Sequence, residues 1–145
     1  MRILIDADGC PVVNQAIEAG RRRGMTVLLF CDTAHEFSRP GAETIVVSKG
    51  ADSADFSLVS RVEPGDVVVT QDYGLAAMCL AKGARPISQD GLRYTEDNID
   101  ALLASRYETK RILVAGYRVK GPKKRRGSQN AAFMDSLSQL LDQNF

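Results

Sequence analysis

The chain has 145 residues, 44% of them hydrophobic and 26% charged, and its formal net charge is +1. This length and balance predict a single globular domain over residues 1–145, and no apolar run reaches the roughly 18 residues of a membrane span. Three cysteines without a C-x-x-C pair argue against a disulfide framework and a zinc knuckle, and an aspartate follows closely on Met1, so we expect a cytoplasmic protein with no membrane partner.

Short apolar runs alternate with helix-like segments along the chain. In chain order we predict a strand at 2–6, a helix at 11–23, a strand at 26–31, a strand at 44–47, a helix at 51–62, a strand at 66–70, a helix at 73–82, a short strand at 85–88, a helix capped by Thr95, and a last amphipathic helix with Phe133, Leu137, Leu140 and Leu141 on one face. Strands without polar alternation, separated by helices, predict an α/β fold: a three-layer Rossmann-like domain around a mainly parallel sheet of four to five strands.

Acidic residues follow three of the predicted strands. Asp6 and Asp8 come after the first, Asp52 and Asp55 after the third, and Asp72 after the fourth. Ligands of open parallel sheets bind beyond the carboxyl ends of the strands, so we expect these acids at one rim, where Mg²⁺ or Mn²⁺ would offset their charge. Each acid also lies near a predicted helix start, and capping is therefore the alternative role for each.

Four ordered motifs carry a resemblance to a known family. They are DADGCPV at 6–12, KGADSAD at 49–55, GDVVVTQDYGLA at 65–76 and DNID at 97–100. Together they resemble the YaiI/YqxD family of uncharacterised bacterial proteins, which is grouped with the PIN-like domains, whose known members are mostly Mg²⁺- or Mn²⁺-dependent ribonucleases.

The resemblance implies roles for particular acids. Asp6 would be the first PIN-like acid, Asp52 or Asp55 the middle one, and Asp72 the acid of the T-x-D motif. A fourth acid usually follows shortly after that motif, but residues 73–76 contain none. Asp8, or Asp90 in the sequence Gln-Asp-Gly, is the candidate to replace it.

One segment is strongly basic. Residues 118–126 contain six cations and no acid, and without these cations the net charge of the chain would be −5. Such a segment can bind a phosphate backbone, although a solvated flexible loop at 118–127, before the last helix, is an equal alternative. The candidate nucleic-acid contacts are Lys49, Lys120, Lys123, Lys124, Arg125 and Arg126.

These observations predict a divalent-metal-dependent nuclease that acts on phosphodiesters, with RNA favoured as the partner and a homodimer left open. Asp6 and Asp72 are the predicted catalytic residues, and the predicted metal ligands are Asp6, Asp8, Asp52, Asp55 and Asp72. Tyr73 and Tyr94 either line the cleft or belong to the core.

Two alternatives remain open. The run ILIDADG at 3–9 resembles the first motif of haloacid-dehalogenase-type phosphohydrolases, in which Asp6 would be the nucleophile and Asp8 the general acid. The missing fourth acid favours a non-catalytic PIN-like module that binds nucleic acid. The P-loop pattern is absent, and a dinucleotide cofactor is not expected because the G-x-G-x-x-G pattern is absent as well.

Overall fold

The computed structural model describes residues 1–32, 39–47, 53–105 and 125–143, with the side chains of residues 53–55 left out. The elements run in the order β1 (Ile3–Asp6), α1 (Val13–Arg22), β2 (Val27–Asp32), β3 (Glu43–Val47), α2 (Ser53–Arg61), β4 (Val67–Val69), α3 (Tyr73–Ala81), β5 (Arg85–Ile87) and α5 (Gly127–Leu141). Residues 99–105 form a further helical segment between β5 and α5.

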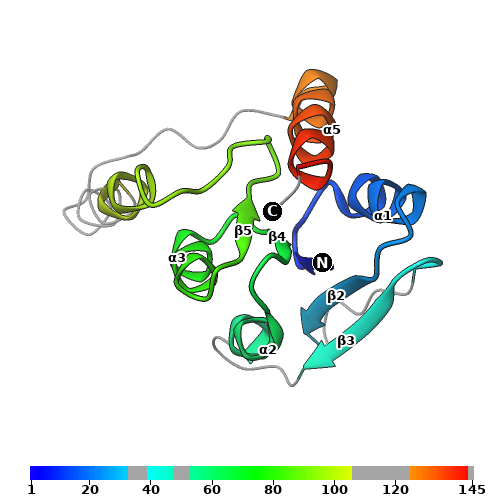
Figure 1. Ribbon diagram of the computed structural model, residues 1–145, viewed down its shortest axis with the longest axis horizontal. Helices are drawn as coiled ribbons and strands as arrows, with labels where there is room; N and C mark the ends of the chain where they lie inside the picture. The colour runs from blue at the N-terminus through cyan, green and yellow to red at the C-terminus, as the bar shows by residue number, and fades with distance from the viewer. Residues whose placement is uncertain (33–38, 48–52, 106–124, 144–145) are drawn as a thin grey trace.

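The five strands form one sheet in the order β3-β2-β1-β4-β5, and every pair of neighbours is parallel. The central strand β1 pairs with β2 from Ile3↔Val27 onward and with β4 from Ile3↔Val67 onward. The chain therefore crosses from one half of the sheet to the other between β3 and β4, and the predicted parallel Rossmann-like fold is confirmed (Figure 1).

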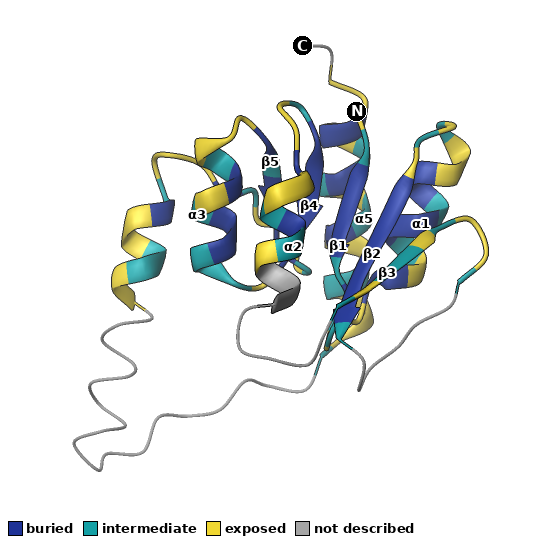
Figure 2. Cartoon of the chain, turned by 90° about the horizontal axis from the view of Figure 1, so that it is seen from below, coloured by how far each residue is buried: buried dark blue, intermediate teal, exposed yellow. Residues whose placement is uncertain are grey.

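Helices cover both faces of the sheet and form a hydrophobic core on each face, and a smaller cluster with Tyr94 and Ile99 packs beside α3. The side chains of Ile3 and Ile5 belong to the core under α1 and α5, whereas Leu4 belongs to the core under α2 and α3. Because successive residues of a strand point to opposite faces, a strand packed on both sides has to be apolar throughout, as β1 is until Asp6. Figure 2 shows these buried strands between the two helical layers.

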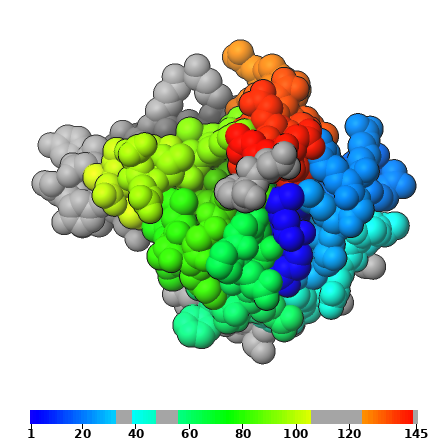
Figure 3. All heavy atoms as spheres, in the orientation of Figure 1, coloured from blue at the N-terminus to red at the C-terminus, as the bar shows by residue number. Residues whose placement is uncertain are grey.

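The last helix packs as its sequence predicts. Phe133, Leu137, Leu140 and Leu141 are all buried on α5, which contacts α1. Figure 3 shows α5 in red, between the blue N-terminal part of the chain and the green part. The helix also lies against the turn after β5, where Ser136 Oγ donates a hydrogen bond to the Gly91 carbonyl at 2.6 Å.

Two helix starts differ from the prediction. α1 begins at Val13 rather than at Pro11, because Val12 is the N-cap residue and its backbone, with φ −118° and ψ 21°, is not helical. Residues 7–10 form a turn before it, in which the Cys10 N–H donates to the Ala7 carbonyl. The helix expected to be capped by Thr95 begins at residue 99. The Thr95 N–H is bound by the Asn98 side chain at 2.9 Å, and this turn precedes the helix.

The basic segment is described only at its end. Residues 118–124 lie outside the described residues, and Gly127, assigned above to a loop, is the first residue of α5. In the described ranges, no helix is both long and apolar enough to cross a membrane.

Candidate functional site

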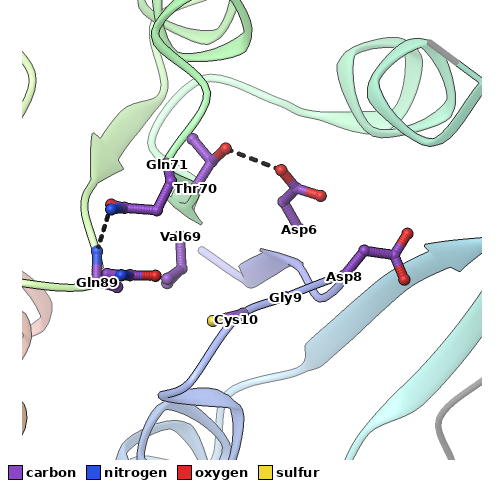
Figure 4. Close-up of a pocket in the computed structure, with 8 residues that line it drawn as sticks. All are labelled: Asp6, Asp8, Gly9, Cys10, Val69, Thr70, Gln71 and Gln89. Carbon is purple, nitrogen blue, oxygen red and sulfur yellow. Dashed lines mark hydrogen bonds between the residues drawn. The ribbon is translucent and has the colours of Figure 1, made fainter. Parts of the chain in front are cut away.

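The carboxyl ends of β1 and β4 lie side by side because these strands are neighbours in the sheet. Asp6 is the last residue of β1, and Thr70 follows β4 directly. The Thr70 hydroxyl donates to Asp6 Oδ2 at 3.0 Å (Figure 4). The same hydroxyl oxygen accepts a hydrogen bond from the Asp72 N–H at 3.0 Å. One buried threonine thus connects the Asp6 carboxylate to the backbone of Asp72, and these are the two residues that the sequence predicts to be catalytic.

Asp72 also caps α3. Its Oδ1 accepts hydrogen bonds from the Gly74 N–H at 2.9 Å and the Leu75 N–H at 3.2 Å. The capping alternative is therefore correct for Asp72. A cap fixes the carboxylate in one orientation, with Oδ1 turned to the helix.

The carboxyl group of Asp6 is unfavourably placed for ionisation. Burial raises its pKa to about 6, the hydrogen bond from Thr70 opposes this shift, and the charges of Asp72 and Asp8 add to it. These two charges act on Asp6 from the turn after β1 and from the start of α3. The site is therefore one in which a nearby cation would be favoured.

Asp8 lies in the turn after β1, two residues after Asp6, but its carboxylate points toward the end of β2. The Asp32 N–H donates to Asp8 Oδ2 at 3.1 Å, so this carboxylate ties the turn to the end of β2. Figure 4 shows the Asp8 carboxylate turned away from Thr70.

A pocket of about 70 Å³ opens between the ends of β1 and β4. It is lined by Asp6, Asp8, Gly9, Cys10, Val69, Thr70, Gln71 and Gln89 (Figure 4). A broader depression of about 460 Å³ shares Asp6 and Gln71 with it and adds Asp72 and Tyr73. The narrow part has room for a water or a small ion, and the broad part has the volume of a small-molecule site.

Several predicted site residues are not among those brought together. Asp52, Lys49 and the side chain of Asp55 lie outside the described part of the chain. Asp90, one of the two candidates for the fourth acid, instead accepts a hydrogen bond from Arg125 Nη1 at 2.6 Å. Within the described ranges, no three His, Cys, Asp or Glu side chains are grouped closely enough to hold a metal ion.

Arg125, at the described end of the basic segment, forms hydrogen bonds within the protein. Besides Asp90, the Arg125 guanidinium donates to Asn130 Oδ1 at 2.7 Å and to the Gln89 carbonyl at 2.6 Å. Arg126 is exposed. Lys120, Lys123 and Lys124 lie outside the described residues, and a nucleic-acid contact of this segment stays a prediction.

The structure adds three residues with hydroxyl or amide side chains to the pocket that the sequence did not single out. Thr70, Gln71 and Gln89 line the pocket, and the Gln89 N–H donates to Gln71 Oε1 at 3.0 Å. The signal for Thr70 was present, because it stands between a buried strand and an acid. Nothing local points to Gln89, which reaches the pocket only because β5 lies next to β4.

Comparisons with known proteins agree on one family. A family model described as the uncharacterized YaiI/YqxD family matches residues 4–143. The chain is similar to a UPF0178 protein of Exiguobacterium sibiricum, with 52% identity across 97% of this chain and 96% of the relative. Others from Ruminiclostridium cellulolyticum (42% identity, 94% and 90%) and Enterococcus faecalis (38% identity, 97% of both) are similar over nearly the whole length. No solved structure matches this chain.

Proposed function

The chain belongs to the YaiI/YqxD family, which carries no assigned activity, and we propose from its site that it is a divalent-metal-dependent nuclease. The observation that carries this proposal is that Asp6 and Asp72 line the same open depression, where the Thr70 hydroxyl bonds the carboxylate of Asp6 and the backbone N–H of Asp72. RNA is the favoured substrate because the family that the motifs resemble is grouped with the PIN-like domains, whose known members are mostly ribonucleases.

The donor set fits Mg²⁺ or Mn²⁺ rather than a softer metal. These ions prefer carboxylate oxygens, often bind one or two carboxylates and keep several waters. Asp6 and Asp72 supply such a pair, and Asp8 lines the adjoining narrow pocket from the turn after β1. A closed cage of three or more ligands is not needed for this mode of binding, and the described residues provide none.

A bound cation would activate a water and stabilise the charge that develops on a phosphodiester. The chain's own groups would set the geometry for this chemistry. Thr70 directs one oxygen of Asp6, and the α3 cap fixes Asp72 Oδ1, so both carboxylates are oriented before any ligand arrives. Asp52 and Asp55 remain proposed further ligands.

The two alternative functions stay predictions. In the phosphohydrolase reading Asp8 would be a general acid close to the Asp6 nucleophile, but its Oδ2 is bound to the Asp32 N–H. In the binding-module reading Asp6 would serve no catalytic purpose. A phospho-aspartate trapped with a metal fluoride would identify the first, and RNA binding without Mn²⁺ that Asp6→Asn does not change would identify the second.

Calorimetric titration with Mn²⁺ tests the proposal. We expect binding by the wild type and at least roughly tenfold weaker binding by Asp6→Asn and by Asp72→Asn. Asparagine caps a helix about as well as aspartate, so Asp72→Asn should keep α3 intact. Asp142→Asn is the matched control, because this acid is paired with Arg23 at the end of α5.

An RNA-cleavage assay on the same four proteins follows. Cleavage should depend on Mn²⁺ and should be lost in both site variants but not in Asp142→Asn. No Mn²⁺ binding by the wild type at millimolar concentrations would refute the proposal. Equal binding by all four proteins would place the metal elsewhere.

A further inference from the structure

Tyr73 is the aromatic side chain of the candidate site. It is the first residue of α3, directly after Asp72, and it lines the broad depression together with Asp6, Gln71 and Asp72. It is partly exposed there. An aromatic surface thus lies beside the two carboxylates at which a phosphodiester would be bound.

The Tyr73 ring packs against the ring of Tyr94. The two rings are 5.9 Å apart between centroids and inclined by 65°, an edge-to-face arrangement. Tyr94 is itself fixed, since it is 3% exposed and its hydroxyl donates to the Thr70 carbonyl at 3.1 Å. The two tyrosines therefore differ in role: Tyr94 belongs to the core, and Tyr73 is the pre-oriented surface in front of it.

Resting on the nuclease function proposed above, we propose that Tyr73 stacks on an unpaired nucleobase next to the phosphodiester at Asp6 and Asp72, so that the site takes single-stranded nucleic acid. Base–aromatic stacking needs a base whose face is free, and a base inside a duplex is already stacked and paired. A rigid ring loses little conformational freedom when a base binds, which favours affinity.

Phe56 offers a comparison within the same chain. It is the most exposed large apolar residue among those described, at 78%, and it lies in the first half of α2. α2 follows β3 and α3 follows β4, so both helices come after strands that end at the same edge of the parallel sheet. Phe56, however, does not line the depression that contains Asp6 and Asp72.

The direct test uses a tryptophan placed at the ring position. The chain contains no tryptophan, so Tyr73→Trp introduces a single tryptophan, and Phe56→Trp is the matched control. Both are made in the Asp6→Asn background, which prevents cleavage. On titration with a single-stranded oligoribonucleotide, we expect quenching of the tryptophan at position 73 and little change at position 56.

Affinity gives the second readout, through the anisotropy of a fluorescein-labelled oligoribonucleotide in the same background. Tyr73→Leu should weaken binding roughly tenfold, since stacking contributes substantially per base, whereas Tyr73→Phe and Phe56→Leu should change it less than about twofold. The duplex of the same sequence should bind more weakly than the single strand. A circular-dichroism melt of each variant verifies its fold, and the tryptophan readout stands if Tyr73→Leu does not fold.

The outcomes separate this inference from the proposed function. Oligoribonucleotide binding without quenching at position 73, equal quenching at position 56, preference for duplex, or no binding at all would overturn the stacking role. Quenching at position 73 in a protein whose wild type neither binds Mn²⁺ nor cleaves RNA would support stacking and refute the nuclease. Mn²⁺-dependent cleavage by the wild type with no effect of Tyr73→Leu on affinity would refute stacking alone.

Discussion

Replacement of Asp6 by asparagine should stabilise the protein at neutral pH. Asparagine is close in size to aspartate and keeps an oxygen that can accept the hydrogen bond of the Thr70 hydroxyl. It removes the negative charge that burial and the carboxylates of Asp72 and Asp8 disfavour. A residue retained for binding a cation is expected to reduce stability when no cation is bound.

The size and the sign of the effect follow from the pKa of Asp6. Its value of about 6 in the folded chain lies above the ordinary 3.8, so the folded state holds the proton more tightly than the unfolded state. At about 1.4 kcal/mol per pH unit, this difference corresponds to roughly 3 kcal/mol. The wild type keeps that stability below pH 4, loses it as the pH rises to about 6, and lacks it above.

Urea unfolding at pH 4 and at pH 8, without divalent metal, measures the effect. We expect the stability of Asp6→Asn relative to the wild type to be higher at pH 8 than at pH 4 by roughly 3 kcal/mol. Asp142→Asn should behave in the opposite way. Arg23 lowers the pKa of the exposed Asp142, so the asparagine variant should lose a little stability at pH 8 and none at low pH.

A stability difference between Asp6→Asn and the wild type that is the same at both pH values would refute this reasoning. It would mean that Asp6 is solvated well enough to ionise at its ordinary pKa. In addition, millimolar Mn²⁺ at pH 8 should stabilise the wild type more than Asp6→Asn, because only the wild type keeps the proposed ligand Asp6. Equal stabilisation of both proteins would show that the Asp6 carboxylate does not take part in Mn²⁺ binding, even if its ionisation destabilises the fold.

Two further predictions concern the frame around the site. Asp66→Asn should destabilise the fold by about 3 kcal/mol in urea unfolding. The buried Asp66 carboxylate accepts hydrogen bonds from the Arg2 backbone N–H at 3.0 Å and from its guanidinium at 2.8 Å. A loss of less than about 1 kcal/mol would contradict this prediction. Gly91→Ala should lower stability by about 2 kcal/mol, since its φ is +89° and a Cβ would come within 2.7 Å of the Ala132 carbonyl oxygen. Gly9→Ala, with φ +72° and open space around the Cβ, should lower it by only about 1 kcal/mol, and equal losses would show that the close approach to α5 does not matter.

The sequence by itself determined the elements and their faces. Apolar runs such as VLLFC, with no polar alternation, predict strands buried on both sides, and the spacing of Phe133, Leu137, Leu140 and Leu141 predicts the buried face of α5. Both predictions are confirmed, because burial leaves its mark in the local pattern of apolar residues. The motifs also placed the chain correctly in its family. The metal, the RNA and the PIN-like relationship stay predictions.

Only the tertiary structure decided which side chains meet. Strand order depends on crossovers between distant segments, so it took the fold to place β4 beside β1 and to connect Asp6 with Asp72 through Thr70. It also turned Asp8 toward the end of β2. An aspartate after a strand can cap a helix, hold a turn or bind a cation, and it has the same chemistry in each case. What distinguishes these roles is the set of groups that long-range packing brings within hydrogen-bonding distance of its carboxylate.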